Sequence, residues 1–263
     1  MDSRTNLGKT PHRRVPAVAS VCLLLGLLML LGGLSSASGA ENKHFLGFEQ
    51  EKDSDSIPTG WEVVPYFRTP ENEMSLSKEG DITILNVKSL GSASALLKRV
   101  DVDIREFPVL VWRWKINRVV GMAIESQKDR NDSAARIRVI FGERGGKPRP
   151  LPPQLEELFK SLGIKSTTKE PPGFKIDYIW GNRLPRGEVF DHPGARNHKI
   201  VVVESGKARV NQWIWEKRNL VEDYELLFEA APSGLSGIVI LTDTDQTNEG
   251  VEAWYSSIVL MGE

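Results

Sequence analysis

Apolar and polar residues alternate over many short segments of the chain, with the period of two that is typical of strands buried on one face. VLVWRWKI places Trp112 and Trp114 on one face, and ARIRVIF places Arg136 and Arg138 opposite its isoleucine and valine. Similar segments follow one another along the chain: DITILNV, IDYIW, HKIVVVESG, ARVNQWIW, GIVIL and AWYSSIVL. Many such strands between turn residues predict a mainly β protein, an antiparallel sandwich or barrel rather than alternating β and α units.

Two segments have helical spacing instead. PPQLEELFKSLG begins with prolines and ends at Gly163, which predicts a short helical insertion near 153–163, between two loops at one end of the sandwich. NLVEDYELLF has Asn219 as an N-cap and Glu222 three residues later, which predicts a short helix near 220–229.

The first forty residues differ from the rest. A basic start is followed by an apolar run over 15–34 and then by small residues up to Ala40, which predicts a secretory signal peptide over 1–40. The alternative is an uncleaved anchor, since the run of 20 residues is long enough to cross a bilayer. We therefore expect a periplasmic or secreted protein whose residues 41–263 form a single β-sandwich domain.

Composition excludes several classes of function. The lone cysteine, Cys22, lies in the predicted signal, so the exported chain has no disulfide, thiol nucleophile or cysteine-bound metal. The 34 basic and 35 acidic residues nearly cancel, which argues against a nucleic-acid partner. Membrane contact is expected only through an uncleaved N-terminus. Catalytic and nucleotide-binding motifs are absent from the sequence, although carboxylates from distant strands could still form a pair as in glycosidases.

The tryptophans and arginines each allow two interpretations. Trp112 and Trp114 are predicted to lie in the core, whereas Trp213 and Trp215 either pack across strands or form a platform for sugar rings. The arginines at 113, 136 and 138 would form one basic patch if their strands pair, suited to carboxylates such as those of acidic sugars. The alternative, which we favour, is a solvated face paired with the acids at 101, 103 and 106.

Two loops carry candidate metal ligands. His192 and His198, together with Asp191, could hold zinc, but their spacing matches no compact zinc motif. TDTDQT places Asp243 and Asp245 at alternate positions, as a calcium loop does. The EF-hand pattern fails, because asparagine and tryptophan occupy its sixth and twelfth positions. A calcium site of another kind is the alternative to an ordinary hydrogen-bonded turn, with Asp243, Asp245 and Glu49 as its candidate ligands. We otherwise expect no cofactor.

Several segments resemble a known family in the same order: VWRWKI, DSAARIRVIF, IDYIWGN, VVVESG, WEKRNLVEDYELLF and GIVILTDTDQTNEGVEAWYSSIVL. The chain resembles the exported bacterial family catalogued as domain of unknown function 3047, over nearly all of its predicted mature part. HFLGFE and AWYSSIVL are also similar to the jelly-roll of galactose-binding-like and carbohydrate-binding modules. Such modules often hold calcium through an acid in the last strand, where this chain has Ser256 and Ser257. The family implies no established activity.

Together these features predict an exported, non-catalytic sandwich that binds a glycan over Trp213, Trp215 and the 242–248 loop, with Arg136 as a polar anchor. The first alternative is an envelope polysaccharide lyase or hydrolase, which would have a cleft where an acid or base meets Arg136 or Tyr178. The second alternative is a structural or assembly protein of the envelope, in which every tryptophan face is buried.

Overall fold

The computed structural model describes residues 43–48, 51, 54, 57–143, 153, 154, 157, 161 and 169–263. Contacts divide the chain into two units, Met1–Ser38 and Gly39–Glu263, and all described residues belong to the second. The predicted signal peptide and Glu49 lie outside the described residues. Of the helix predicted near 153–163, residues 153, 154, 157 and 161 are described, and all four are helical. In the described part of the chain, no helix is long and apolar enough to cross a membrane.

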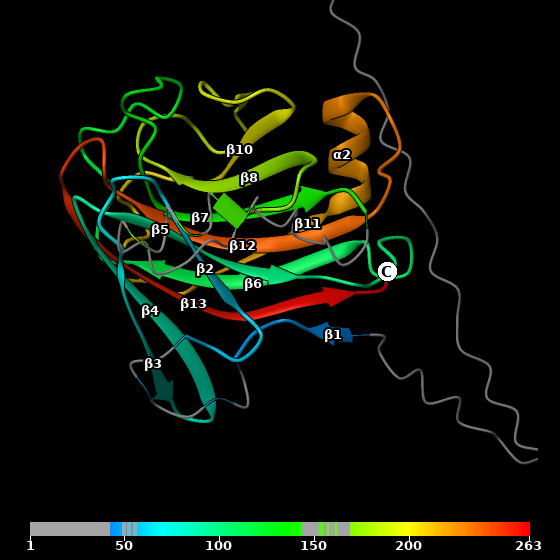
Figure 1. Cartoon of the computed structure of the whole chain (residues 1–263), viewed down its shortest axis with the longest axis horizontal. Coiled ribbons are helices and arrows are strands. Elements are labelled where there is room, and N and C mark those ends of the chain that lie inside the picture. The colour runs from blue at the N-terminus through cyan, green and yellow to red at the C-terminus, as the bar shows by residue number, and fades with distance from the viewer. Residues whose placement is uncertain are drawn as a thin grey trace, which may run out of the picture. The chain divides into compact units, whose positions relative to one another are not determined.

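The described residues form two β-sheets (Figure 1). In sheet A the strand order is β11 (Ile214–Asn219), β6 (Val109–Ile116), β13 (Gly250–Met261), β4 (Ile82–Leu90), β3 (Glu73–Glu79), with β1 (Lys43–Phe45) also paired to β13. In sheet B the order is β2 (Glu62–Pro65), β5 (Ala93–Arg99), β12 (Leu235–Asp243), β7 (Ser133–Phe141), β8 (Phe174–Gly181), β10 (His198–Ser205), β9 (Val189–Asp191). The prediction of a mainly β sandwich is confirmed at this level, whereas the jelly-roll topology stays a prediction.

One strand pair departs from the predicted antiparallel arrangement. Strands β8 and β10 run parallel, while β9 pairs antiparallel to β10. The chain runs from β8 to β9 at the edge of the sheet, reverses its direction, and returns as β10 between these two strands. Strand β10 therefore has the same direction as β8. This crossover brings residues at the start of β10 beside the start of β8.

Aromatic side chains from the two sheets meet in the core. Trp112 and Trp114 have no exposed surface, and both point from β6 of sheet A towards β8 of sheet B. The ring of Trp112 lies 5.5 Å from that of Tyr178, and the ring of Trp114 lies 6.1 Å from that of Trp180. The prediction that Trp112 and Trp114 are core residues is therefore confirmed.

Helix α2 (Leu220–Phe228) confirms the helix predicted near 220–229, and Figure 1 shows it at one end of the strands. The Asn219 side chain accepts hydrogen bonds from the backbone N–H groups of Val221 and Glu222, as its predicted role as N-cap requires. The helix ends at Glu229, which adopts a left-handed conformation and returns a hydrogen bond to Glu225.

Replacing a core tryptophan should cost far more stability than replacing an exposed one. Trp114→Ala leaves a large cavity and should lower the free energy of unfolding by about 3–5 kcal/mol. Trp215, which is 57% exposed, should lose about 1 kcal/mol or less when changed to alanine. Urea unfolding followed by circular dichroism measures both, and equal losses would contradict the assignment of core and surface.

Candidate functional site

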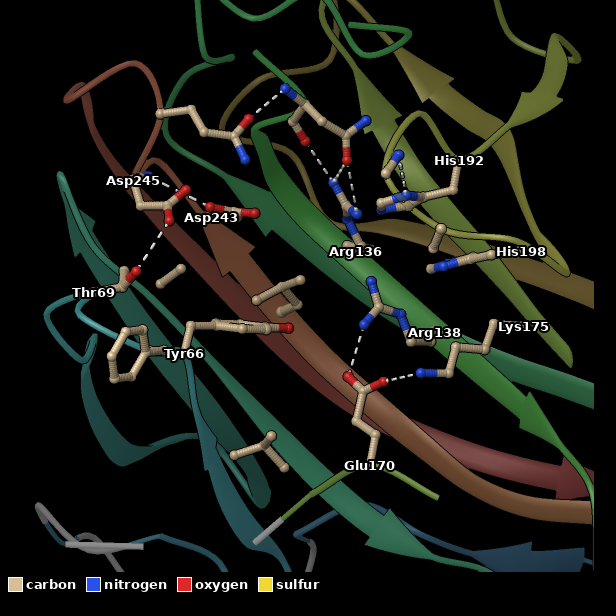
Figure 2. Close-up of a pocket in the computed structure, with 18 of the residues that line it drawn as sticks. Tyr66, Thr69, Arg136, Arg138, Glu170, Lys175, His192, His198, Asp243 and Asp245 are labelled. Carbon is tan, nitrogen blue, oxygen red and sulfur yellow. Dashed lines mark hydrogen bonds and ion pairs between the residues drawn. The ribbon is translucent and has the colours of Figure 1, made fainter. Parts of the chain in front are cut away.

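A pocket of about 600 Å³ opens on the outer face of sheet B (Figure 2). Ile137 and Val139 of β7 point into the core, so Arg136 and Arg138, which alternate with them, point outwards, into this pocket. Strands β8, β10 and β12 and the segment after β2 complete its wall, with these residues among the lining: Tyr66, Phe67, Thr69, Glu170, Lys175, His192, His198, Asp243 and Asp245.

The floor of the pocket is built around one fully buried carboxylate, that of Asp177. Arg138 donates to it through Nε at 2.7 Å and Nη2 at 2.9 Å, and Arg136 donates through Nη1 at 2.8 Å. Nε2 of His198 lies 2.8 Å from the same carboxylate. Burial alone would raise the pKa of Asp177, but Arg138, His198 and Arg136 together hold it well below its ordinary value. Asp177 is therefore charged.

A second acid extends this network towards the pocket's rim. Glu170 accepts a hydrogen bond from Arg138 at 2.7 Å and another from Lys175 at 2.5 Å (Figure 2). Burial opposes ionisation of Glu170, and the two cations more than offset it, so its pKa is lowered. Because a buried charge without a partner is costly, this alternating series of charges fixes the floor in one arrangement.

Two neutral histidines stand beside the arginines. The rings of His192 and His198 stack at 4.3 Å. Burial, the other imidazole and Arg136 lower the pKa of His192 to about 3, and burial is also the main reason that the pKa of His198 is lowered. The backbone N–H of Gly194 donates to Nδ1 of His192 at 3.1 Å, so its proton is on Nε2.

These histidines do not form the zinc site considered from the sequence. Asp191 is exposed and pairs with Lys199. Asp177 replaces it near the two imidazoles, with one ligand atom from each residue within 4.8 Å of the others. The oxygens of Asp177 already accept from two guanidinium groups, whose positive charge repels a metal ion. The cluster therefore suits zinc poorly.

Three carboxylates gather at the opposite end of the pocket, where Asp132 joins Asp243 and Asp245 with oxygens within 4.8 Å of one another. Asp132 accepts from the backbone N–H and the hydroxyl of Thr247, at 2.8 and 2.6 Å. Asp245 accepts from the hydroxyl of Thr69 at 3.2 Å. Burial, and then repulsion by the other two acids, raises the pKa of Asp243 well above its ordinary value although Arg136 opposes the shift.

The acidic cluster has features of both interpretations of TDTDQT, the hydrogen-bonded turn and the calcium site. The loop has its own turn hydrogen bonds, from the N–H of Asp245 to Asp243 at 3.4 Å and from Asn248 to the carbonyl of Thr244 at 2.9 Å. Its carboxylates also have the chemistry of ligands for a hard divalent cation such as calcium. Calcium binding stays a prediction, and its third expected ligand, Glu49, lies outside the described residues.

The residues predicted to form one glycan site lie on two different sheets. Arg136, Asp243 and Asp245 line the pocket on sheet B. Trp213 and Trp215 belong to the β11 region of sheet A and are not among the described residues that line it. The structure therefore separates the tryptophan pair from its expected polar anchor, because β11 belongs to sheet A whereas β7 and β12 belong to sheet B.

The less favoured interpretation, in which the three arginines form one basic patch, is wrong for the same reason. Arg113 lies on β6 in sheet A, whereas Arg136 and Arg138 lie on β7 in sheet B. The favoured alternative, a solvated face, is also wrong for β7, since its two arginines are buried and pair with Asp177 and Glu170. Tyr178 is a core residue that donates to Asp223 at 2.6 Å.

Sequence reasoning missed Tyr66 and Glu170, which line the pocket, and Asp132 and Asp177, which accept hydrogen bonds from lining residues. One signal was available for Asp177. Its strand and β7 both mix charged residues with outward-pointing isoleucines, here Ile140 and Ile179, and such a mixture indicates a face that is partly covered rather than solvated.

The comparisons with known proteins agree with the family resemblance and add little beyond it. The model of the family described as "Protein of unknown function (DUF3047)" matches residues 59–259. No curated protein matches the sequence.

Several solved structures resemble the fold weakly. The xyloglucanase domain of NopAA, a type three effector from Sinorhizobium fredii in complex with cellobiose, has 8% identity and a TM-score of 0.41 and covers 81% of this chain and 99% of its own. Endoglucanase cel12A from Rhodothermus marinus has 9% identity and a TM-score of 0.40, covering 80% and 96%. A mutant of the carbohydrate-binding module CBM29-2, complexed with cellulohexaose, has 10% identity and a TM-score of 0.32, covering 83% and 91%. Scores this low support no inference about ligand or activity.

The raised pKa of Asp243 predicts a pH-dependent effect of Asp243→Asn. The folded state favours the protonated acid, so the charged form of Asp243 lowers the free energy of unfolding. This lowering is absent below the ordinary pKa of 3.8 and grows as pH rises through the raised pKa of the folded state. Asp243→Asn should therefore raise the free energy of unfolding at about pH 8 and leave it nearly unchanged near pH 3. The exposed Asp191→Asn is the control, and a gain that does not depend on pH would contradict the account.

Proposed function

The chain belongs to the DUF3047 family of proteins of unknown function, and we propose that it is a non-catalytic protein whose sheet B pocket binds a segment of a glycan. The observation that carries this proposal is the combination of a fixed polar floor with an aromatic wall in one open pocket. Pockets that bind small ligands typically join such apolar surface to a few convergent polar groups.

The polar groups of the pocket suit a ligand with many hydroxyls. Asp245 offers hydrogen-bond acceptors at one end of the pocket, and Lys175 offers donors at the other. Between them His192 presents an N–H group in its neutral state. Sugar hydroxyls both donate and accept, so they can satisfy this mixed set, whereas a purely apolar or purely anionic ligand would leave part of it unpaired.

The aromatic wall suits the flat C–H face of a sugar ring. Phe67 lines the pocket and is nevertheless 70% exposed, with the guanidinium of Arg68 at 4.9 Å from its ring centre. Tyr66 lies beside it, and burial raises the pKa of its hydroxyl, which therefore stays neutral and can donate. Arg68 has a φ of 60°, a strained conformation of the kind that concentrates at functional sites.

The buried ion network reduces the conformational entropy that the pocket loses on binding. Arg136 and Arg138 are already held by Asp177, so the floor loses little freedom when a ligand arrives. The same proposal includes export through the N-terminal segment, a jelly-roll strand order and binding of glycans outside the cytoplasm. It includes no cofactor.

Removal of the exposed aromatic ring tests this proposal directly. The protein is screened on an array of neutral oligosaccharides, and the tightest ligand is measured by calorimetry. Phe67→Ala should weaken it about three- to tenfold through loss of one stacking contact. Leu226→Ala, which removes a 78% exposed side chain from α2 outside the pocket lining, should leave it unchanged. Failure of every oligosaccharide to bind, with and without calcium, would overturn the proposal.

A second candidate function, glycan cleavage, is favoured by one feature of the same pocket. The carboxyl group of Asp243, whose pKa is raised by burial, lies near Arg136, and its oxygen is within 4.8 Å of oxygens of Asp132 and Asp245. Retaining glycosidases place two carboxyl groups about 5–5.5 Å apart, one of which gives its proton to the departing sugar oxygen while the other attacks the sugar carbon.

Chromatography of array ligands after prolonged incubation separates the two candidates. Binding alone predicts intact oligosaccharides. Cleavage predicts shorter products that disappear in Asp243→Asn while binding is retained, because the amide cannot supply the proton.

A further inference from the structure

Three tryptophans and two cations alternate on the outer face of sheet A. The guanidinium of Arg113 lies 4.4 Å from the ring centre of Trp213 and 5.8 Å from that of Trp215. The ammonium of Lys115 lies 4.9 Å from the ring centre of Trp213 and 4.6 Å from that of Trp254. These five residues are here called the cation–aromatic ladder. Four of them lie on the neighbouring strands β11, β6 and β13, and Trp213 immediately precedes β11.

Packing of the core does not account for the ladder. Trp112 and Trp114 fill the inner face of β6, so Arg113 and Lys115 point away from the core. Trp215 is 57% exposed and stands on β11, the last strand in the order of sheet A. Significant cation–ring contacts occur about once per 70–80 residues, and here they concentrate in one patch of surface.

The positive charges of the ladder are not neutralised within the described structure. Neither Arg113 nor Lys115 forms an ion pair with a described carboxylate, and Nε and Nη2 of Arg113 have no hydrogen-bond partner there. Glu79, whose charge acts on Arg113, accepts a hydrogen bond from Nε1 of Trp213 at 2.8 Å. Burial lowers the pKa of Arg113, and only Glu79 opposes this shift. A ligand that brings negative charge would therefore improve the environment of both cations.

We propose that the cation–aromatic ladder is a second binding surface, separate from the pocket, which takes a glycan of uronic acids. Each unit of such a glycan has an apolar ring face and a carboxylate, and the ladder offers an indole and a cation in the same alternation. Sugar rings stack on Trp215, and their carboxylates pair with Arg113 and Lys115. The overall formal charge of −1 disfavours nucleic acid, which could also stack on indoles. Pocket and ladder lie on different sheets, so the ladder can bind whether or not the pocket does.

The probe for this surface is a hexamer of galacturonic acid, compared with its fully methyl-esterified form. The ester keeps the sugar rings and removes the charges. Calorimetry should detect binding of the acid form at about 50 mM salt. The ester should bind at least about tenfold more weakly, and the acid form should bind more weakly at about 500 mM salt than at about 50 mM. Equal binding of the two forms, or no binding of the acid, would overturn the proposal.

Variants locate the hexamer on the protein. Trp215→Ala and Lys115→Gln should each weaken the acid hexamer by about five- to tenfold. Leu90→Ala, a 79% exposed side chain on β4, is the matched surface control and should have no effect. Phe67→Ala tests the pocket and should also have no effect on this ligand. Loss in Phe67→Ala with normal binding in Trp215→Ala would assign the hexamer to the pocket, overturning this proposal and supporting the first. The proposal would also be overturned if a single-stranded oligonucleotide displaced the hexamer as effectively as unlabelled hexamer does.

Discussion

The pocket depends on one fully buried carboxylate, that of Asp177. Two arginines and a histidine surround it, and loss of any partner would leave an ion in a place that water hardly reaches. This requirement links three strands, since Arg138 of β7 lies opposite Asp177 of β8 in the sheet register, and His198 reaches Asp177 from β10. The parallel crossover from β8 to β10 serves this arrangement, because it brings the start of β10 alongside β8.

Apolar side chains on both sides protect the network from solvent. One small cluster contains Ile140, Val239 and Leu241, and another contains Ile179 and Ile200. Both clusters lie on the outer face of sheet B, so this face is neither a second core nor an ordinary wet surface. The charges between the clusters are costly to bury, and their retention at the floor of an open pocket points to recognition of a ligand rather than to stability.

The sequence predicted what depends on local pattern. Alternation placed Trp112 and Trp114 in the core, and Asn219 marked the start of α2. It could not predict which strands become neighbours, because that choice depends on contacts between residues far apart in the chain. Arg113 and Arg136 looked equivalent from alternation and belong to different sheets. Asp132 reaches the TDTDQT loop across more than a hundred residues, and no local pattern reveals that contact. The signal peptide, export and any role of Glu49 stay predictions.

The most direct test of the central claim is a crystal structure of the protein bound to the neutral oligosaccharide that it retains most tightly. The account predicts a sugar ring against Phe67 and Tyr66, with its hydroxyls bonded to groups around the Arg136–Asp177–Arg138 floor and the floor itself unmoved. A ligand found only outside this pocket, or a floor whose ion pairs separate when the sugar binds, would contradict it.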